Sequence, residues 1–144
     1  MKANELKVTD LMVGDWVICY HPSRLKSFEK VSVGLLHTMQ EQEYGHIKED
    51  CPLFRIVEPI PLTSEILEKN GFEKAENIQL YYYCLGIDDR VSLHDYVCDI
   101  NSSNTWHVHI DSEDYCTIAN CELTYVHELQ QILRLCKIDK EIVV

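Results

Sequence analysis

The sequence predicts an α+β protein, and three observations indicate that class. Short apolar runs bounded by turn-forming residues recur through most of the chain, which is typical of antiparallel strands. A capped segment in the middle of the chain has the pattern of a short helix. The last part shows apolar residues at helical spacing. At 144 residues, the chain fits a single domain spanning 1–144.

The first part of this domain, residues 11–62, is predicted to form a small β-lobe. Its expected strands cover residues 16–20, 31–36 and 53–57, and the turn Val13-Gly14-Asp15 leads directly into the first of them. Strands this short commonly curl into a small barrel, so an SH3-like barrel is one interpretation. An irregular β-lobe packed on the rest of the chain is the other.

A short helix is predicted over residues 63–72. Thr63 or Ser64 can accept a hydrogen bond from the first turn and so cap its start. Gly71 is well placed for the left-handed conformation that ends many helices, and the apolar Phe72 then completes a Schellman stop.

An antiparallel meander is predicted over residues 78–123. Its four expected strands are 78–86, 91–100, 105–110 and 115–123, and turn-rich tetrads join them. Connections this short favour hairpins over crossovers.

The meander is expected to be packed by a C-terminal helix over residues 124–137, capped at Thr124. One apolar stripe runs along this helix through Val126, Leu129, Leu133 and Cys136. A lone sheet must bury its apolar side, so we expect the stripe to cover one face of the meander.

The charge balance argues against nucleic acid as a partner. Thirteen basic residues face 24 acidic ones, for a formal net charge of -11. Nucleic acid is bound mainly by neutralising phosphates, and the only basic cluster is Arg24, Lys26 and Lys30, with Glu29 inside it. The acidic charge serves solubility or complements a basic partner, and another protein is the expected partner.

Cysteine usage and hydropathy predict a cytoplasmic protein. The seven cysteines are odd in number, irregularly spaced and without a Cys-x-x-Cys motif, so reduced thiols are expected. The first nine residues are polar and lack the apolar core of a signal peptide. No stretch approaches the roughly 20 apolar residues of a membrane span, and we expect no membrane association.

Three segments resemble a family of small uncharacterised proteins from Bacteroidetes genomes, their phages and mobile elements. They are Leu11 with Val13-Gly14-Asp15-Trp16-Val17, then Pro59-Ile60-Pro61-Leu62-Thr63 with Gly71-Phe72, and finally Tyr125-Val126-His127-Glu128-Leu129-Gln130. The chain departs from the family at Ile66, where members tend to carry tryptophan, at Asn70, where they tend to carry phenylalanine, and in its last residues. The resemblance implies a bacterial or phage cytosolic accessory protein and carries over no activity, cofactor or catalytic residue.

A metal site is one interpretation of the segment Trp106-His107-Val108-His109-Ile110-Asp111. Strand alternation places His107, His109 and Asp111 on one face, and His127 is a further ligand candidate from the last helix. Two histidines and a carboxylate can hold iron or zinc. The favoured alternative is a half-buried strand with a polar outer face, because no second ligand motif accompanies it. We therefore expect no metal and no cofactor.

Two further segments are candidate binding surfaces. On the last helix, His127, Gln130, Gln131 and Arg134 follow the polar side and would form a recognition strip, although any surface helix has such a face. In the run Tyr81-Tyr82-Tyr83, an exposed pair formed by Tyr81 and Tyr83 would suit a protein interface. Packing in the core is the favoured alternative for these rings.

No residue pattern points to catalysis. The chain lacks a phosphate-binding glycine loop, a Gly-x-Ser-x-Gly turn and a His-Glu-x-x-His helix. We therefore predict an accessory protein that acts as a protein-interaction or regulatory module, and not an enzyme. The alternatives are a small metal-dependent enzyme and an acidic mimic that inhibits a DNA-binding protein. The sequence makes no prediction of oligomeric state.

Overall fold

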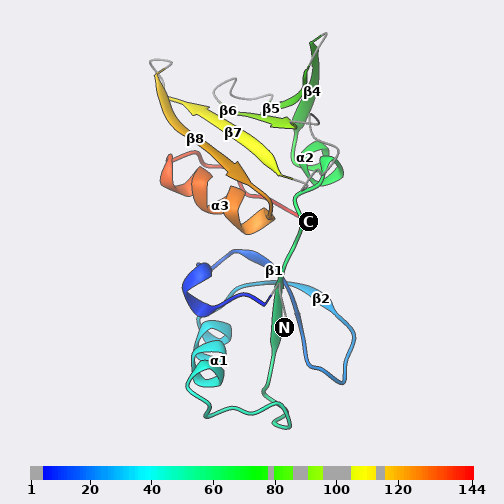
Figure 1. The fold of residues 1–144 in the computed structure, drawn as a ribbon, viewed down its shortest axis with the longest axis vertical. Coiled ribbons are helices and arrows are strands. Elements are labelled where there is room, and N and C mark those ends of the chain that lie inside the picture. Colours follow the sequence, from blue (N-terminus) through cyan, green and yellow to red (C-terminus); the bar gives the residue numbers. More distant parts are fainter. Residues whose placement is uncertain (1–4, 78–79, 86–90, 96–104, 113–115) are drawn as a thin grey trace. The chain divides into compact units, whose positions relative to one another are not determined.

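The structure is a computed structural model that describes residues 5–77, 80–85, 91–95, 105–112 and 116–144 (Figure 1). It forms two compact units, Met1–Ile60 and Pro61–Val144, and the division falls inside the Pro59-Ile60-Pro61 segment. Each unit contains an antiparallel sheet and at least one helix, so the α+β class is confirmed. The single-domain prediction stays a prediction.

The N-terminal unit contains a three-stranded sheet in the order β2-β1-β3. Its strands are β1 (Trp16–Tyr20), β2 (Ser27–Lys30) and β3 (Ile56–Pro59), and a short 3-10 helix, η1 (Val8–Asp10), precedes them. Strand β1 pairs antiparallel with both neighbours. Within the described residues of this unit the sheet is open, and no closed barrel is seen.

A tight turn leads into β1, as the sequence predicts. Gly14 has a positive φ of 92°, a conformation that glycine adopts without steric cost. Its N–H donates to the carbonyl of Val31 (2.8 Å), while the N–H of Val31 donates to the carbonyl of Asp15 (2.8 Å). Gly14 and Asp15 therefore both lie opposite Val31. This is the geometry of a glycine β-bulge at the point where β1 and β2 begin to pair.

The strand predicted over residues 31–36 is wrong, because a helix begins there. Helix α1 spans Val33–Glu43, and the side chain of Ser32 caps it by accepting a hydrogen bond from the N–H of Leu35 (3.1 Å). Such a cap satisfies one of the free N–H groups of the first turn. The strand expected over 53–57 is shifted to β3, and Leu53 is exposed.

The core of the N-terminal unit lies between α1 and one face of the sheet. Val17, Cys19 and Val57 point inward from β1 and β3, and Met39 packs against them from α1. This inner face takes every second residue of β1, as the pleat of a strand requires.

Cys19 is expected to resist alkylation in the native protein. Burial, together with the nearby Glu29 carboxylate, raises the pKa of Cys19 to about 12. The thiolate is the reactive form, so almost none is present at pH 8 to 9. Iodoacetamide should label the exposed Cys116 in the folded state, and Cys19 only after unfolding. Equal labelling rates in native protein, measured by peptide mass spectrometry, would contradict the buried position.

The C-terminal unit contains a five-stranded antiparallel meander. Its strands, β4 (Phe72–Asn77), β5 (Leu80–Leu85), β6 (Val91–Asp95), β7 (Trp106–Asp111) and β8 (Thr117–Leu123), follow one another in sheet order (Figure 1). The predicted meander is therefore confirmed, with its four strands present as β5 to β8, and the sheet has one strand more than predicted. Strand β4 is the addition, and it pairs with β5 from Phe72 opposite Leu85 to Asn77 opposite Leu80.

Helix α2 spans Ser64–Lys69 and matches the short predicted helix. Thr63 caps it by accepting a hydrogen bond from the N–H of Ile66 (3.3 Å). Gly71 has the expected positive φ, at 82°. Phe72 then begins β4 at once, so the helix ends earlier than the predicted 63–72 segment.

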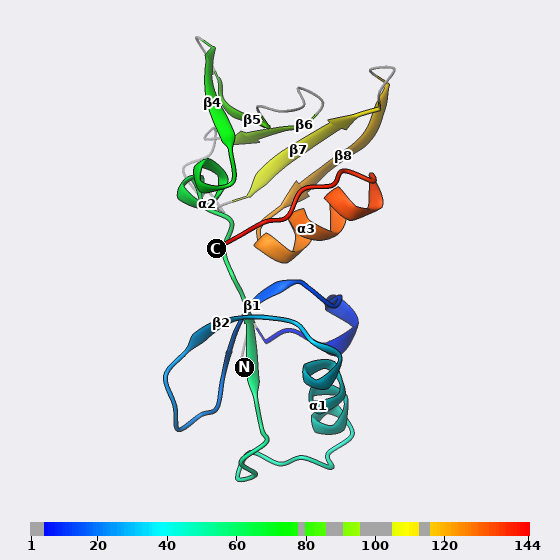
Figure 2. The same cartoon turned by 180° about the vertical axis from the view of Figure 1, so that it is seen from behind.

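Helix α3 spans Val126–Leu135 and lies alongside β8 (Figure 2). The predicted cap at Thr124 is wrong, since Tyr125 is the N-cap residue. The carboxylate of Glu128 closes this end by accepting hydrogen bonds from the N–H groups of Thr124 (2.7 Å) and Tyr125 (3.0 Å). Three members of the predicted stripe, Val126, Leu129 and Leu133, are buried, which confirms that it faces the interior.

Two buried side chains, Trp106 and Asn70, form hydrogen bonds between distant segments of this unit. The indole N–H of Trp106 donates to the carbonyl of Leu62 (2.8 Å). The amide of Asn70 donates to the carbonyls of Ile66 and Val143 (both 2.7 Å) and accepts from the N–H of Val143 (2.8 Å). The segment after α3 is therefore fastened to the C-terminal end of α2.

Candidate protein-interaction site

The outer face of the β2-β1-β3 sheet carries large side chains that the core does not use. Burial alternates along β1, so Trp16, Ile18 and Tyr20 are half-buried while the residues between them are buried. Phe28 on β2 lies directly opposite Ile18. This outer face is therefore rich in aromatic and aliphatic surface.

Strand β2 is the exposed edge of the sheet. All four of its residues are exposed, including Phe28 at 58%, and the preceding Leu25 is 94% exposed. A shallow hollow of about 270 Å³ lies against the strand and is lined by Ile18, Lys26, Ser27 and Phe28. The strand is short and carries Glu29 and Lys30, as natural edge strands commonly do, and Phe28 is its one large apolar side chain.

The backbone of β2 can accept another strand. Val31 donates to the carbonyl of Asp15, so this pair is hydrogen-bonded across β1 and β2. Antiparallel pairs alternate between bonded and non-bonded positions, and three residues back Phe28 falls on a non-bonded one. Its N–H and C=O consequently point away from β1, toward the open edge.

Lysines sit over the aromatic rings of the outer face. Lys26 lies 4.9 Å from the ring centroid of Tyr20, and Lys30 lies 5.4 Å from that of Trp16. The Lys26 ammonium also donates to Glu58 on β3 (2.7 Å), which accepts from the Tyr20 hydroxyl as well (2.8 Å). These hydrogen bonds raise the pKa of Lys26 and lower the pKa of Glu58, so both stay charged near neutral pH.

The opposite edge of the sheet, strand β3, is covered. The N–H of Leu6 donates to the carbonyl of Val57 (3.0 Å). At Arg55, the residue just before β3, the side-chain amide of Gln42 donates to the backbone carbonyl (2.8 Å) and accepts from the N–H (2.7 Å). Backbone groups along this edge therefore have partners from the N-terminal segment and from α1.

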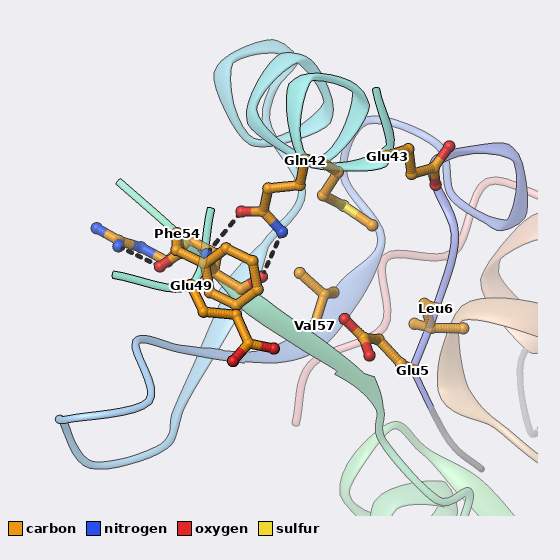
Figure 3. A pocket seen from close by; sticks show the side chains of 9 residues that line it. Glu5, Leu6, Gln42, Glu43, Glu49, Phe54 and Val57 are labelled. Atoms are coloured by element: carbon orange, nitrogen blue, oxygen red, sulfur yellow. Dashed lines mark hydrogen bonds between the residues drawn. The ribbon is translucent and has the colours of Figure 1, made fainter. Parts of the chain in front are cut away.

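A second hollow, of about 270 Å³, lies between α1, β3 and the N-terminal segment (Figure 3). Its apolar wall includes Leu6, Phe54 and Val57, and Glu5, Glu43 and Glu49 add carboxylates at its margin. Glu43 also accepts a hydrogen bond from the N–H of Val8 (2.9 Å), which gives it a role in the fold. Within the described residues, no group of three or more His, Cys, Asp or Glu side chains is arranged to hold a metal ion.

The predicted metal ligands on β7 share a face, as expected. Burial alternates along this strand, with Trp106, Val108 and Ile110 inside and the two histidines and Asp111 half-buried. Nε2 of His109 lies 2.9 Å from a carboxylate oxygen of Asp111, whereas neither His107 nor His127 completes a metal-binding group in the described part of the chain. The arrangement matches a polar strand face.

The predicted recognition strip on α3 is wrong for two of its four members. His127 and Gln130 are buried, and the ring of His127 stacks on Tyr125 with centroids 5.9 Å apart. Gln131 is half-buried and Arg134 is exposed. Because two of the four side chains are buried, α3 does not present them as a continuous exposed recognition strip.

The tyrosine candidates belong to β5. Tyr81 pairs with Asp95 and Tyr83 with Leu93 across β5 and β6. The side chains of Tyr81 and Tyr83 lie outside the part of the chain that the structure describes, so the predicted aromatic pair stays a prediction.

Sequence reasoning missed Leu25 and Phe28 as candidate binding residues. Both are interleaved with Arg24, Lys26 and Lys30, whose positive charge argues only about nucleic-acid binding. Two large apolar residues interleaved with basic ones are the signal that marks this segment.

No family model matches the chain, and neither a curated protein nor a solved structure matches it. In the described residues, no helix has the length and apolar character needed to cross a membrane.

Proposed function

We propose that this protein is an interaction module that binds an extended segment of another protein along strand β2. The observation that carries the proposal is an open sheet edge with exposed apolar side chains, Phe28 on the strand and Leu25 just before it. An added strand gains main-chain hydrogen bonds from the edge and specificity from alternate side chains. The accessory role in a bacterium or phage that the family resemblance implies is part of this proposal.

The chemistry of the edge supports binding more than catalysis. Phe28 offers peptide groups for pairing, and Ile18 beside it offers an apolar contact. The charged side chains near them, Lys26 and Glu58, are paired with each other. Such a surface provides recognition, with no nucleophile or general base singled out.

A selection from displayed random peptides tests the proposal. We expect the intact chain to enrich peptides, and Phe28→Ser to weaken their binding by about 2 kcal/mol, as for a central interface residue. Leu25→Ser should also weaken binding, whereas Leu53→Ser, which changes another exposed leucine in a loop, should not. Hydrogen exchange at the Phe28 amide should slow in the complex.

A different result in the same selection would contradict strand addition at β2. Peptides that bind Phe28→Ser and Leu25→Ser as well as the unaltered chain, without protection of the Phe28 amide, would show that β2 is not the binding edge.

A further inference from the structure

The outer-face positions of the β2 segment are Lys26, Phe28 and Lys30. The two lysines reach over aromatic rings of β1, and Phe28 lies opposite Ile18 of β1. All three side chains therefore share the outer face. In a strand added to this edge, every second residue would stand across from one of them. These three positions therefore determine what the added strand must carry.

We propose that the segment bound at β2 is an acidic strand of a different protein, with an apolar residue flanked two places away on each side by a carboxylate. This inference rests on the proposed function and specifies its partner. The apolar residue would meet Phe28. One carboxylate would meet Lys30, and the other would share the Lys26 ammonium with Glu58, which already accepts a hydrogen bond from it. Opposite charges across a strand pair stabilise it, and like charges directly opposite destabilise it.

The charge of the segment supports an acidic partner. Arg24, Lys26 and Lys30 stand against Glu29 and Glu58, so this cluster is positive in a chain whose net charge is -11. The excess of acidic over basic residues is larger in residues 61–144, which hold fifteen and six, than in residues 1–60, which hold nine and seven. Electrostatic attraction would consequently direct an acidic segment to this edge of the N-terminal unit.

A second copy of the chain fits the edge poorly. Antiparallel pairing of two β2 strands with Phe28 opposite Phe28 places Lys26 opposite Lys30 twice. Shifting the register so that Phe28 meets Lys30 places Glu29 opposite Glu29. Both registers set like charges against each other, which disfavours self-association.

Single-stranded nucleic acid also fits this face poorly. Bases stack on the open faces of aromatic rings. Here Lys30 lies over Trp16 and Lys26 lies over Tyr20, so one face of each ring is occupied. Glu58 adds a carboxylate to the same surface, where a phosphate backbone would be repelled.

Two synthetic peptides, TDTITDT and TKTITKT, separate these possibilities. Each is titrated into the intact chain while the backbone amides of β2 are followed by NMR. We expect the acidic peptide to bind about tenfold more tightly, since two cross-strand pairs change from attractive to repulsive. The preference should fall to about one in Lys30→Glu, because the outer-face positions of the β2 segment then hold one lysine and one carboxylate, beside Glu58 of β3.

Lys48→Glu is the matched control, because it makes the same charge change at an exposed loop residue far along the chain from β2. It should keep the tenfold preference. If Lys48→Glu abolishes the preference as Lys30→Glu does, the effect is one of net charge and the inference is overturned.

The remaining outcomes separate the inference from the proposed function. Equal binding of both peptides at β2 would overturn the acidic pattern and leave strand addition intact. Absence of any β2 shift with either peptide at millimolar concentration would overturn strand addition itself. Tighter binding of an oligothymidine than of TDTITDT at β2, or a dimer in sedimentation that Phe28→Ser dissociates, would also overturn the inference.

Discussion

Replacing Leu133 with alanine should lower the free energy of unfolding by about 2 to 5 kcal/mol, the usual cost of truncating a buried leucine. Leu133 is 1% exposed on the inner side of α3, next to the buried Leu129. A loss of this size is a large share of the stability of a domain. The measurement is the midpoint of urea unfolding, converted to free energy.

The control is the same substitution two residues later on the same helix. Leu135 is 75% exposed, so Leu135→Ala should change stability by no more than about 0.5 kcal/mol. Similar shifts for the two variants would show that α3 does not contribute its apolar stripe to the core.

Asn70→Ala should lower the free energy of unfolding by about 3 kcal/mol, because it removes the three hydrogen bonds of a buried side chain, each worth about 1 kcal/mol. The lost partners are the carbonyl of Ile66 and both backbone groups of Val143. The segment after α3 should become more sensitive to proteases, which limited digestion with mass spectrometry would detect.

Lys69→Ala tests whether any contact to this segment is equally important. Lys69 donates to the carbonyl of Val144 (2.9 Å) but is exposed, so its loss should cost less than about 1 kcal/mol. If Asn70→Ala were as mild as Lys69→Ala, and digestion were unchanged, the buried amide would not be what holds the segment.

Elements with a strong local signal could be predicted from the sequence. The turn before β1 depends on Gly14, the cap of α2 on Thr63 and the stop after it on Gly71, and each acts through its own backbone or side chain. The inward stripe of α3 follows from spacing alone. These features need no information about distant parts of the chain.

Elements decided by distant partners or by one side chain could not be predicted. The run from Val31 to Leu36 has strand-like composition, yet the Ser32 cap starts α1 within it. Strand β4 carries charged residues at alternate and adjacent positions, and it becomes a strand by pairing with β5. Strand β2 is equally polar around Phe28. The interleaved Leu25 and Phe28 mark this segment in the sequence, but its position at a sheet edge depends on the sheet order.

The two edges of the N-terminal sheet differ, and this difference limits how far strand addition can continue through this sheet. A fibre made of stacked strands grows only when each molecule offers two open edges. Here the carbonyl of Val57 already accepts from Leu6, and Gln42 occupies both backbone groups of Arg55. A strand that joins at β2 therefore ends the series in this sheet instead of extending it, which suits a one-to-one complex at this edge.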